Sequence, residues 1–122
     1  MTLSEAELLA KVPTGLYIDG QWVEGRGENA IAVEDPATGK VLLEIANANA
    51  QDGLAALAAA DAAQAKWAKT APRERAEILR RTFDLVRERA EEFAMLISLE
   101  MGKPITEARG EVTYGKDRKS VV

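Results

Sequence analysis

The hydrophobic pattern changes its period near residue 46, and this change constrains the fold more than any other feature. Before it, apolar residues alternate around turn-forming residues, as in "GLYIDGQWVEG" and "AIAVEDPATGKVLLEIA". After it, they recur at the three- and four-residue intervals that are typical of amphipathic helices. The sequence therefore predicts N-terminal β-hairpins followed by three to four α-helices.

Turn-forming residues separate the strands of both predicted hairpins. Asp19-Gly20 lies between two β-prone runs, which is a strong local signal for a hairpin turn. Asp35, Pro36 and Gly39 supply the turn chemistry between the strands of the second pair.

Capping residues divide the helical parts of the chain. Ser4 is the predicted N-cap of a short helix within a lead-in of residues 1–14. Asn49 is the predicted N-cap of an alanine-rich helix over residues 50–69, and Thr70 is the predicted cap of the next helix.

The later helices carry apolar stripes that need a covering layer. Gly102 is predicted to end one helix, and Pro104 to open another that runs towards Tyr114. Short strands offer these stripes too little partner surface, so we expect the sequence to be the beginning of a larger protein. The stripe residues are Leu79, Phe83, Val86, Phe93, Leu96 and Ile97.

Cysteine and histidine are both absent from the 122 residues. Thiol nucleophiles, disulfides and zinc–thiolate sites are therefore excluded, and so is the commonest general base and metal ligand. The net charge of −4 disfavours nucleic acid and anionic membranes as partners. No apolar run approaches the ~20 residues of a membrane span, and the acids within residues 1–13 argue against a signal peptide. We therefore expect a cytoplasmic location.

Two glycine motifs resemble phosphate-binding loops only in part. Gly25 and Gly27 form a G-x-G without a third glycine at dinucleotide spacing and without a helix start, so a loop after a strand explains them better. Gly102-Lys103 lacks the upstream glycine of a phosphate loop, so a helix C-cap explains this pair better.

Charged side chains also form no catalytic constellation. Glu91 and Glu92 are neighbours on a helix and diverge, so a solvated face is favoured over acid–base catalysis for them and for Glu100. We therefore expect no catalytic, cofactor-binding or metal-binding residue in this chain.

The arginines of the central helices alternate with acids and lack an aromatic platform. Ion-paired helix surface is therefore favoured over a nucleic-acid groove, with Arg73–Glu77 and Glu77–Arg81 as expected pairs at i, i+4. The arginines concerned are Arg73, Arg75, Arg80, Arg81, Arg87 and Arg89.

Four segments follow one another in order: "LYIDGQWVEG", "VEDPATGKVLLEIANA", "KWAKTAPRERAEILRR" and "LISLEMGKPITEARGEVTYG". Together they closely resemble the N-terminal region of the NAD(P)-dependent aldehyde dehydrogenases, over residues 16–115. The combination of "APRERAEILRR" with "EMGKPITEARGEV" most resembles the succinate-semialdehyde dehydrogenase branch of that family. Branches that act on other small aldehydes share "GKP" and "EARGE".

The resemblance implies an α/β parent fold and a homo-oligomeric enzyme that oxidises a small aldehyde with NADP or NAD. In that family a cysteine thiolate attacks the aldehyde, hydride passes to the nicotinamide, and a glutamate base activates the hydrolytic water. Those residues, the cofactor fingerprint and the oligomerisation strand lie downstream of the matched region. We therefore expect residues 15–115 to be a truncated, inactive scaffold part that binds no cofactor.

The last residues, Asp117 to Val122, do not continue the resemblance. The bases GATCGGAAGAGCGTCGTG encode them, and that string is the start of a common sequencing adapter. We therefore expect residues 116–122 to be a non-native tail at the end of a DNA fragment.

Two functions of different classes stay open. In the first, the parent gene encodes an aldehyde dehydrogenase, and its reading frame continues past Gly115 into a cysteine-containing region. In the second, the chain is a stand-alone, non-catalytic helical module that docks on a full-length dehydrogenase or another partner. Because its stripes lack cover, we expect the isolated chain to be aggregated or loosely packed.

Overall fold

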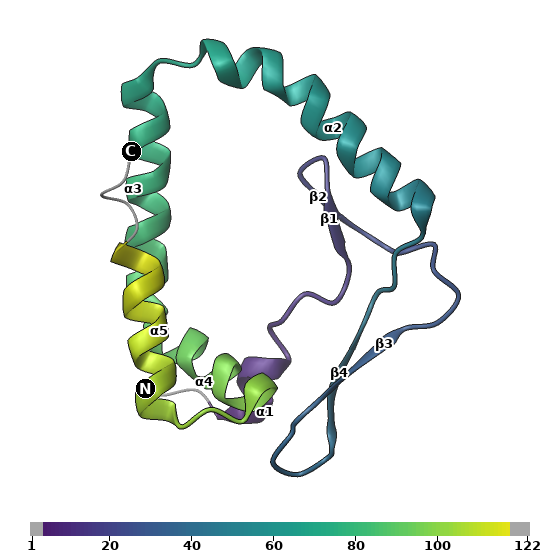
Figure 1. Cartoon of the computed structure of the whole chain (residues 1–122), viewed down its shortest axis with the longest axis vertical. Helices are drawn as coiled ribbons and strands as arrows, with labels where there is room; N and C mark the ends of the chain where they lie inside the picture. The colour runs from purple at the N-terminus through teal and green to yellow at the C-terminus, as the bar shows by residue number, and fades with distance from the viewer. Residues whose placement is uncertain (1–3, 118–122) are drawn as a thin grey trace.

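The computed structural model describes residues 4–117 of the chain, which follow one another around an open ring (Figure 1). The predicted tail of residues 116–122 lies outside the described residues from position 118 onward. In chain order the elements are α1 (Glu5–Leu9), β1 (Leu16–Ile18), β2 (Gln21–Val23), β3 (Ile31–Glu34), β4 (Val41–Ile45), α2 (Ala50–Lys69), α3 (Pro72–Glu88), α4 (Ala90–Met101) and α5 (Ile105–Asp117). The predicted order of hairpins followed by helices is therefore confirmed.

A complete capping box opens α1, as the sequence predicts. The Ser4 hydroxyl accepts a hydrogen bond from the Glu7 N–H at 3.3 Å, and the Glu7 carboxylate accepts one from the Ser4 N–H at 2.8 Å. These bonds satisfy two N–H groups that the helix itself leaves free. The helix then buries Leu8, which is 2% exposed.

The first predicted hairpin pairs β1 with β2 in antiparallel register, with Ile18 opposite Gln21. Asp19 and Gly20 form its two-residue turn with φ values of 51° and 74°. Positive φ at both central residues is the signature of the turn whose twist matches that of the strands. The Asp-Gly prediction is therefore confirmed.

The second predicted hairpin pairs β3 with β4 in a separate two-stranded sheet. Val33 lies opposite Leu43, and an irregularity follows between Val33 and Glu34. In the turn, the Asp35 carboxylate accepts hydrogen bonds from the Ala37 N–H and the Thr38 hydroxyl, both at 2.8 Å. Gly39 has φ 69°, and this left-handed conformation explains the glycine.

The Asn49 cap of α2 is confirmed, whereas the Thr70 prediction is wrong. Thr70 is the C-cap of α2, and its hydroxyl donates to the Lys66 carbonyl at 3.1 Å. Pro72 begins α3 and leaves the N-cap position to Ala71, which has no side-chain oxygen. A proline at the first helical position requires the cap immediately before it, one residue beyond Thr70.

The turn at Arg89 separates α3 from α4, with φ −105° and ψ 20°. The sequence pattern does not predict this break, because no glycine or proline marks it. The two predicted signals further along are confirmed. Gly102 caps α4 at φ 67°, and α5 begins directly after Pro104.

The buried apolar core lies where α4 packs on α5 and on the end of α3. Ala94, Ala108 and Val112 form its centre, at 0%, 0% and 7% exposed. We call these three residues the corner core. Small side chains allow the helices to approach closely, and half-buried residues pack around them, namely Val86, Ala90 and Ile97.

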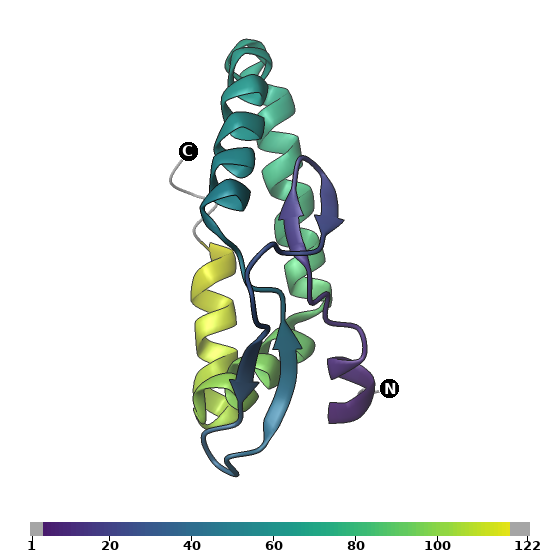
Figure 2. The same cartoon turned by 90° about the vertical axis from the view of Figure 1, so that its right-hand side faces the viewer.

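Outside the corner core, many apolar side chains of the described residues are exposed to solvent or only half-buried. The chain exposes 9319 Å², whereas a compact monomer of 13.2 kDa exposes about 6,400 Å². Of the six predicted stripe residues, Leu79 is 44% and Phe93 37% exposed, and the other four are only half-buried. Seen from the side, the ring is narrow, and no second layer of described residues covers its face (Figure 2).

Candidate functional site

The G-x-G of Gly25 and Gly27 lies in the loop after β2, as the loop interpretation predicts. The Gly27 N–H donates to the Asn47 carbonyl at 3.0 Å. A Cβ on Gly25 would lie 1.9 Å from the same oxygen, and a Cβ on Gly27 would lie 2.8 Å from it. These glycines therefore permit two chain segments to cross in contact.

Two of the three acidic candidates, Glu91 and Glu92, form separate ion pairs. Arg109 holds Glu91 through two nitrogens at 2.8–3.1 Å, and Arg89 holds Glu92 at 2.8 Å. The Arg109 guanidinium lowers the pKa of the Glu91 carboxyl below its ordinary value. Glu100 is exposed at the end of α4. The carboxylates point to separate partners, and no shared acid–base site results.

The ion-paired surface on α3 is confirmed, but its pairs differ from the expected ones. Glu77 pairs with Arg80 at 3.1 Å, three residues away, and neither Arg73 nor Arg81 is its partner. Arg80 also reaches Asp84 at 3.3 Å and so is shared between two acids. The Arg80–Asp84 pair has the predicted i, i+4 spacing, but it joins other residues than the expected ones.

Gly102-Lys103 is a helix end, as predicted. The Gly102 N–H donates to the Ser98 carbonyl at 2.9 Å, and the Ser98 hydroxyl donates to the Lys103 carbonyl at 2.7 Å. The Lys103 ammonium pairs with Glu111 on α5. The lysine therefore connects two helices.

Among residues 4–117 the most buried charged group is Asp52, at 4% exposed, and the sequence pattern does not single it out. Its carboxylate accepts hydrogen bonds from the Arg26 N–H at 2.8 Å and the Asn49 N–H at 3.0 Å. The Asn49 side chain in turn donates to the Arg26 carbonyl at 3.3 Å. We call Arg26, Asn49 and Asp52 the polar joint, because they bind the start of α2 to the loop after β2.

Backbone hydrogen bonds determine the electrostatics of the polar joint. The Asn49 and Arg26 N–H groups lower the pKa of Asp52 below its ordinary value, with a smaller contribution from the Arg26 charge. The spacing of Asn49 and Asp52, an N-cap and an acid at N3, is a capping-box signal that could have identified half of this joint. The contact with Arg26 is tertiary and has no local signal.

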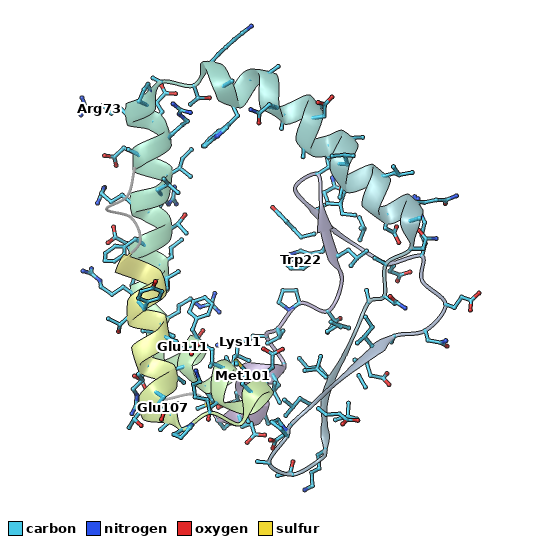
Figure 3. All side chains as sticks on the ribbon, viewed as in Figure 1. Lys11, Trp22, Arg73, Met101, Glu107 and Glu111 are labelled. Carbon is cyan, nitrogen blue, oxygen red and sulfur yellow. The ribbon has the colours of Figure 1, made fainter. Side chains whose placement is uncertain are left out.

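An open apolar hollow of about 670 Å³ lies where α2 meets α3. Trp67 and Leu79 contribute exposed apolar surface to it, and three arginines are among the other residues that line it: Arg73, Arg75 and Arg80. Further along the ring, Trp22 points into the opening, whereas Arg73 points away from it (Figure 3). Such a surface can bury another polypeptide layer.

The charged candidate residues have separate partners in the described part of the chain. Within residues 4–117 no group of three or more acids could hold a metal ion. None of the described helices is long and apolar enough to cross a membrane. The arrangement positions chain segments against one another and leaves apolar surface exposed.

Comparison with known proteins gives a consistent result. The model of the "Aldehyde dehydrogenase family" matches residues 22–119. A succinate-semialdehyde dehydrogenase of Paenarthrobacter nicotinovorans is 62% identical over 77 residues, which are 63% of this chain and 17% of that protein. A glutarate-semialdehyde dehydrogenase of Pseudomonas aeruginosa is 38% identical over 114 residues, which are 93% of this chain and 23% of that protein.

Solved structures contain the same arrangement of elements. An NADP dependent enzyme of E. coli matches with a TM-score of 0.85 and 35% identity, over 94% of this chain and 23% of that one. A betaine aldehyde dehydrogenase of Staphylococcus aureus in complex with NAD+ matches with a TM-score of 0.86 and 27% identity, over 89% of this chain and 22% of that one. The chain thus spans about a fifth of the length of the proteins it matches.

Proposed function

Because the chain belongs to the aldehyde dehydrogenase family, we propose that it is a scaffold part of an enzyme that oxidises succinate semialdehyde to succinate. The single observation that carries the substrate proposal is the 62% identity over 77 residues to a succinate-semialdehyde dehydrogenase. The proposed electron acceptor is NAD or NADP. One structural neighbour is an NADP dependent enzyme and another is a complex with NAD+, and both support this proposal.

The proposed role of this segment is to support the catalytic region rather than to take part in the chemistry. Its described residues are held by helix caps, ion pairs and the polar joint, all of which are structural interactions. A cysteine nucleophile cannot come from a chain without cysteine. The exposed apolar side chains of α2 and α3 provide a surface on which the rest of an enzyme can pack.

The alternative substrate is another small aldehyde. The two relatives described above, a succinate- and a glutarate-semialdehyde dehydrogenase, are named for aldehydes of one chemical class. Succinate semialdehyde and glutarate semialdehyde are each an aldehyde with a carboxylate at the far end, and they differ by one methylene. One methylene in a pocket changes discrimination by roughly 10–200-fold. The choice between them therefore depends on the enzyme's substrate pocket.

The decisive experiment first determines the natural gene sequence after codon 115 and then assays the full-length product. We propose that the reading frame continues past Gly115 into a cysteine-containing region, and that residues 116–122 are not native. The full-length product, once expressed, is assayed for kcat/KM with both semialdehydes. We expect succinate semialdehyde to be preferred roughly tenfold or more. A preference for the longer aldehyde would overturn the substrate proposal.

The 122-residue chain itself is expected to be inactive. Purified chain, mixed with succinate semialdehyde and NAD or NADP, should reduce no cofactor, because it lacks the thiol. A full-length family member in the same assay is the positive control. Turnover by the purified chain, after mass spectrometry has excluded a contaminant, would contradict the assignment of roles.

The second candidate function is a non-catalytic interaction module, and the exposed apolar surface favours it. A stop codon after residue 122 in the natural gene, together with a soluble product, would support this function. For the parent enzyme we also propose a homo-oligomer and a cytoplasmic location. Sedimentation of the full-length product and cell fractionation test these two proposals.

A further inference from the structure

Two Asp-Gly dipeptides occur in the chain, Asp19-Gly20 and Asp52-Gly53, and their surroundings differ sharply. We propose that Asp19-Gly20 is a site of spontaneous backbone isomerisation to isoaspartate, whereas Asp52-Gly53 is protected by the fold. The modification needs no enzyme and no cofactor. It concerns the stability of the first hairpin over time and is independent of the proposed catalytic function.

The reaction proceeds in two balanced steps. The Gly20 backbone nitrogen attacks the side-chain carboxyl carbon of Asp19 in its protonated form, a C–N bond forms, and one water leaves. The product is a five-membered succinimide ring. Water then adds to the main-chain carbonyl of the ring and breaks that C–N bond, so the chain continues through the side-chain carbon. The mass of the chain is unchanged overall.

The turn leaves Asp19 accessible to this reaction. Both residues are exposed at the tip of the hairpin. Among the residues that the structure describes, no hydrogen bond or ion pair holds the Asp19 carboxylate. Its backbone is in the left-handed region, at φ 51°, which is sparsely populated for a residue with a side chain. Glycine as the following residue places no side chain in the way of the attack.

The polar joint holds the second dipeptide in an unreactive arrangement. The Asp52 carboxylate already accepts hydrogen bonds from the Arg26 and Asn49 N–H groups, at 2.8 Å and 3.0 Å. The Gly53 N–H, which would be the nucleophile, donates to the Asn49 carbonyl at 3.2 Å. Ring closure there requires the first turn of α2 to open, and only the open fraction can react.

Isomerisation would disrupt the hairpin that contains it. An isoaspartate adds one carbon to the backbone of a two-residue turn whose length determines the pairing of Ile18 with Gln21. The next pair places the rings of Tyr17 and Trp22 at 5.1 Å between centroids. We expect both the strand pairing and this ring contact to be lost in the modified chain.

The experiment compares the two dipeptides within one sample. Purified chain is incubated at mildly acidic pH in water enriched in oxygen-18, because each passage through the succinimide incorporates one oxygen from the solvent. Trypsin then separates the two sites, since one lies in residues 12–26 and the other in residues 41–66. We expect label and a shifted chromatographic peak to appear at least about tenfold faster at Asp19 than at Asp52, which corresponds to about 1.4 kcal/mol of local opening.

A denatured sample measures the intrinsic reactivity of each site. In concentrated guanidinium the two peptides should react at similar rates, because the fold no longer distinguishes them. Similar rates in the native sample as well would overturn the proposal. A native rate at Asp19 that is tenfold below its own denatured rate would also overturn it, since the turn would then be protective.

An Asn variant supplies a matched control for the geometry. Asp19→Asn keeps a sequence that favours the same turn and forms the same succinimide with loss of ammonia. We expect it to convert in the native chain, with a measurable gain in mass. A native D19N chain that stays unconverted, while its denatured form converts, would show that the turn prevents ring closure.

Discussion

α2 and the corner formed by α4 and α5 are both regular helical regions, but different interactions hold them. Along its 20 residues, α2 buries Asp52 at its start and leaves Leu54 and Leu57 each 66% exposed. The corner has few large apolar side chains inside, yet it buries Ala94 and Ala108 completely. α2 is therefore fixed at one end by a polar joint, and the corner is fixed along its length by close packing.

The comparison of α2 with the corner shows that the formation of a helix and its placement in the fold depend on different interactions. Alanine-rich composition and a capping box are sufficient to specify α2 as a helix, since both act locally. Isolated helices remain marginal, however, and most helical stability in proteins comes from the packing of one face. α2 still lacks that packing among the described residues, whereas the corner already has it.

The largest expected effect concerns the whole chain. With many large apolar side chains exposed and most of the others only half-buried, the isolated chain should bind a hydrophobic dye and keep helical far-ultraviolet dichroism, without a cooperative melt. The measurement is dye fluorescence together with circular dichroism during heating. A sharp melt of a monomer with dispersed side-chain NMR signals would show that α2 is as well packed as the corner.

The second-largest expected effect is that of a charge introduced into the corner core, compared with the same charge introduced on α2. Val112→Asp places a carboxylate in the corner core, where an uncompensated buried charge costs on the order of 3–5 kcal/mol. We expect amide hydrogen exchange in α4 and α5 to become as fast as in an unfolded peptide. Leu57→Asp is the matched control on the exposed face of α2 and should leave exchange in the corner unchanged. Equal effects of both variants would remove the distinction.

Added volume should have a smaller effect of the same kind. Ala108→Leu overfills the corner core, and inserting methylenes into a packed site costs about 1–3 kcal/mol. Ala56→Leu adds the same volume on exposed α2 and should be nearly neutral. Hydrogen exchange of the two helices again reports the difference. Tolerance of leucine at position 108 would mean that the corner is loosely packed.

Glycine replacement should strengthen α2 slightly. Gly53 lies in the helix, a Cβ there would meet nothing within 4 Å, and alanine is favoured over glycine by roughly 0.5–1 kcal/mol. Gly53→Ala should therefore raise helicity measured by circular dichroism. Gly102→Ala is the opposing control, because φ is 67° there and the new Cβ would lie 3.0 Å from the Pro36 ring. It should lower the stability of the corner.

Acid should weaken the start of α2, and this effect is the most local. The pKa of Asp52 is lowered in the fold, so its stabilising contribution is fully present above its ordinary value of 3.8 and is lost as the pH falls through the lower folded value. Amide exchange in the first turn of α2 should accelerate in that window. Asp52→Asn removes the titration, so its first turn should show no such pH dependence. An acid response that persists in D52N would show that the titration of another carboxylate controls the first turn of α2.

Local signals made most of the fold predictable from the sequence. The Asp19-Gly20 turn, the Asn49 cap and the Gly102 C-cap each act within a few residues, so the pattern reveals them directly. The Thr70 prediction is wrong because Pro72 is the first helical residue of α3, which makes Ala71 the N-cap. The break at Arg89 carries no turn residue, so the sequence offers no sign of it.

The composition restricts the chemistry of the candidate site mainly through the residue types that it lacks. The absence of cysteine and histidine restricts the chemistry at once, and helix geometry separates Glu91 from Glu92. The contact between Asp52 and Arg26 joins residues 26 positions apart. Such a contact follows from the path of the chain in space, which no short-range pattern encodes.

The hairpin of β3 and β4 touches other parts of the ring at both of its ends. At its base, the Gly27 N–H donates to the Asn47 carbonyl, two residues before the Asn49 cap of α2. At its tip, Pro36 lies so close to Gly102 that a Cβ on the glycine would approach the proline ring to 3.0 Å. The hairpin therefore spans the distance between the end of α4 and the start of α2, two regions that do not share the corner core.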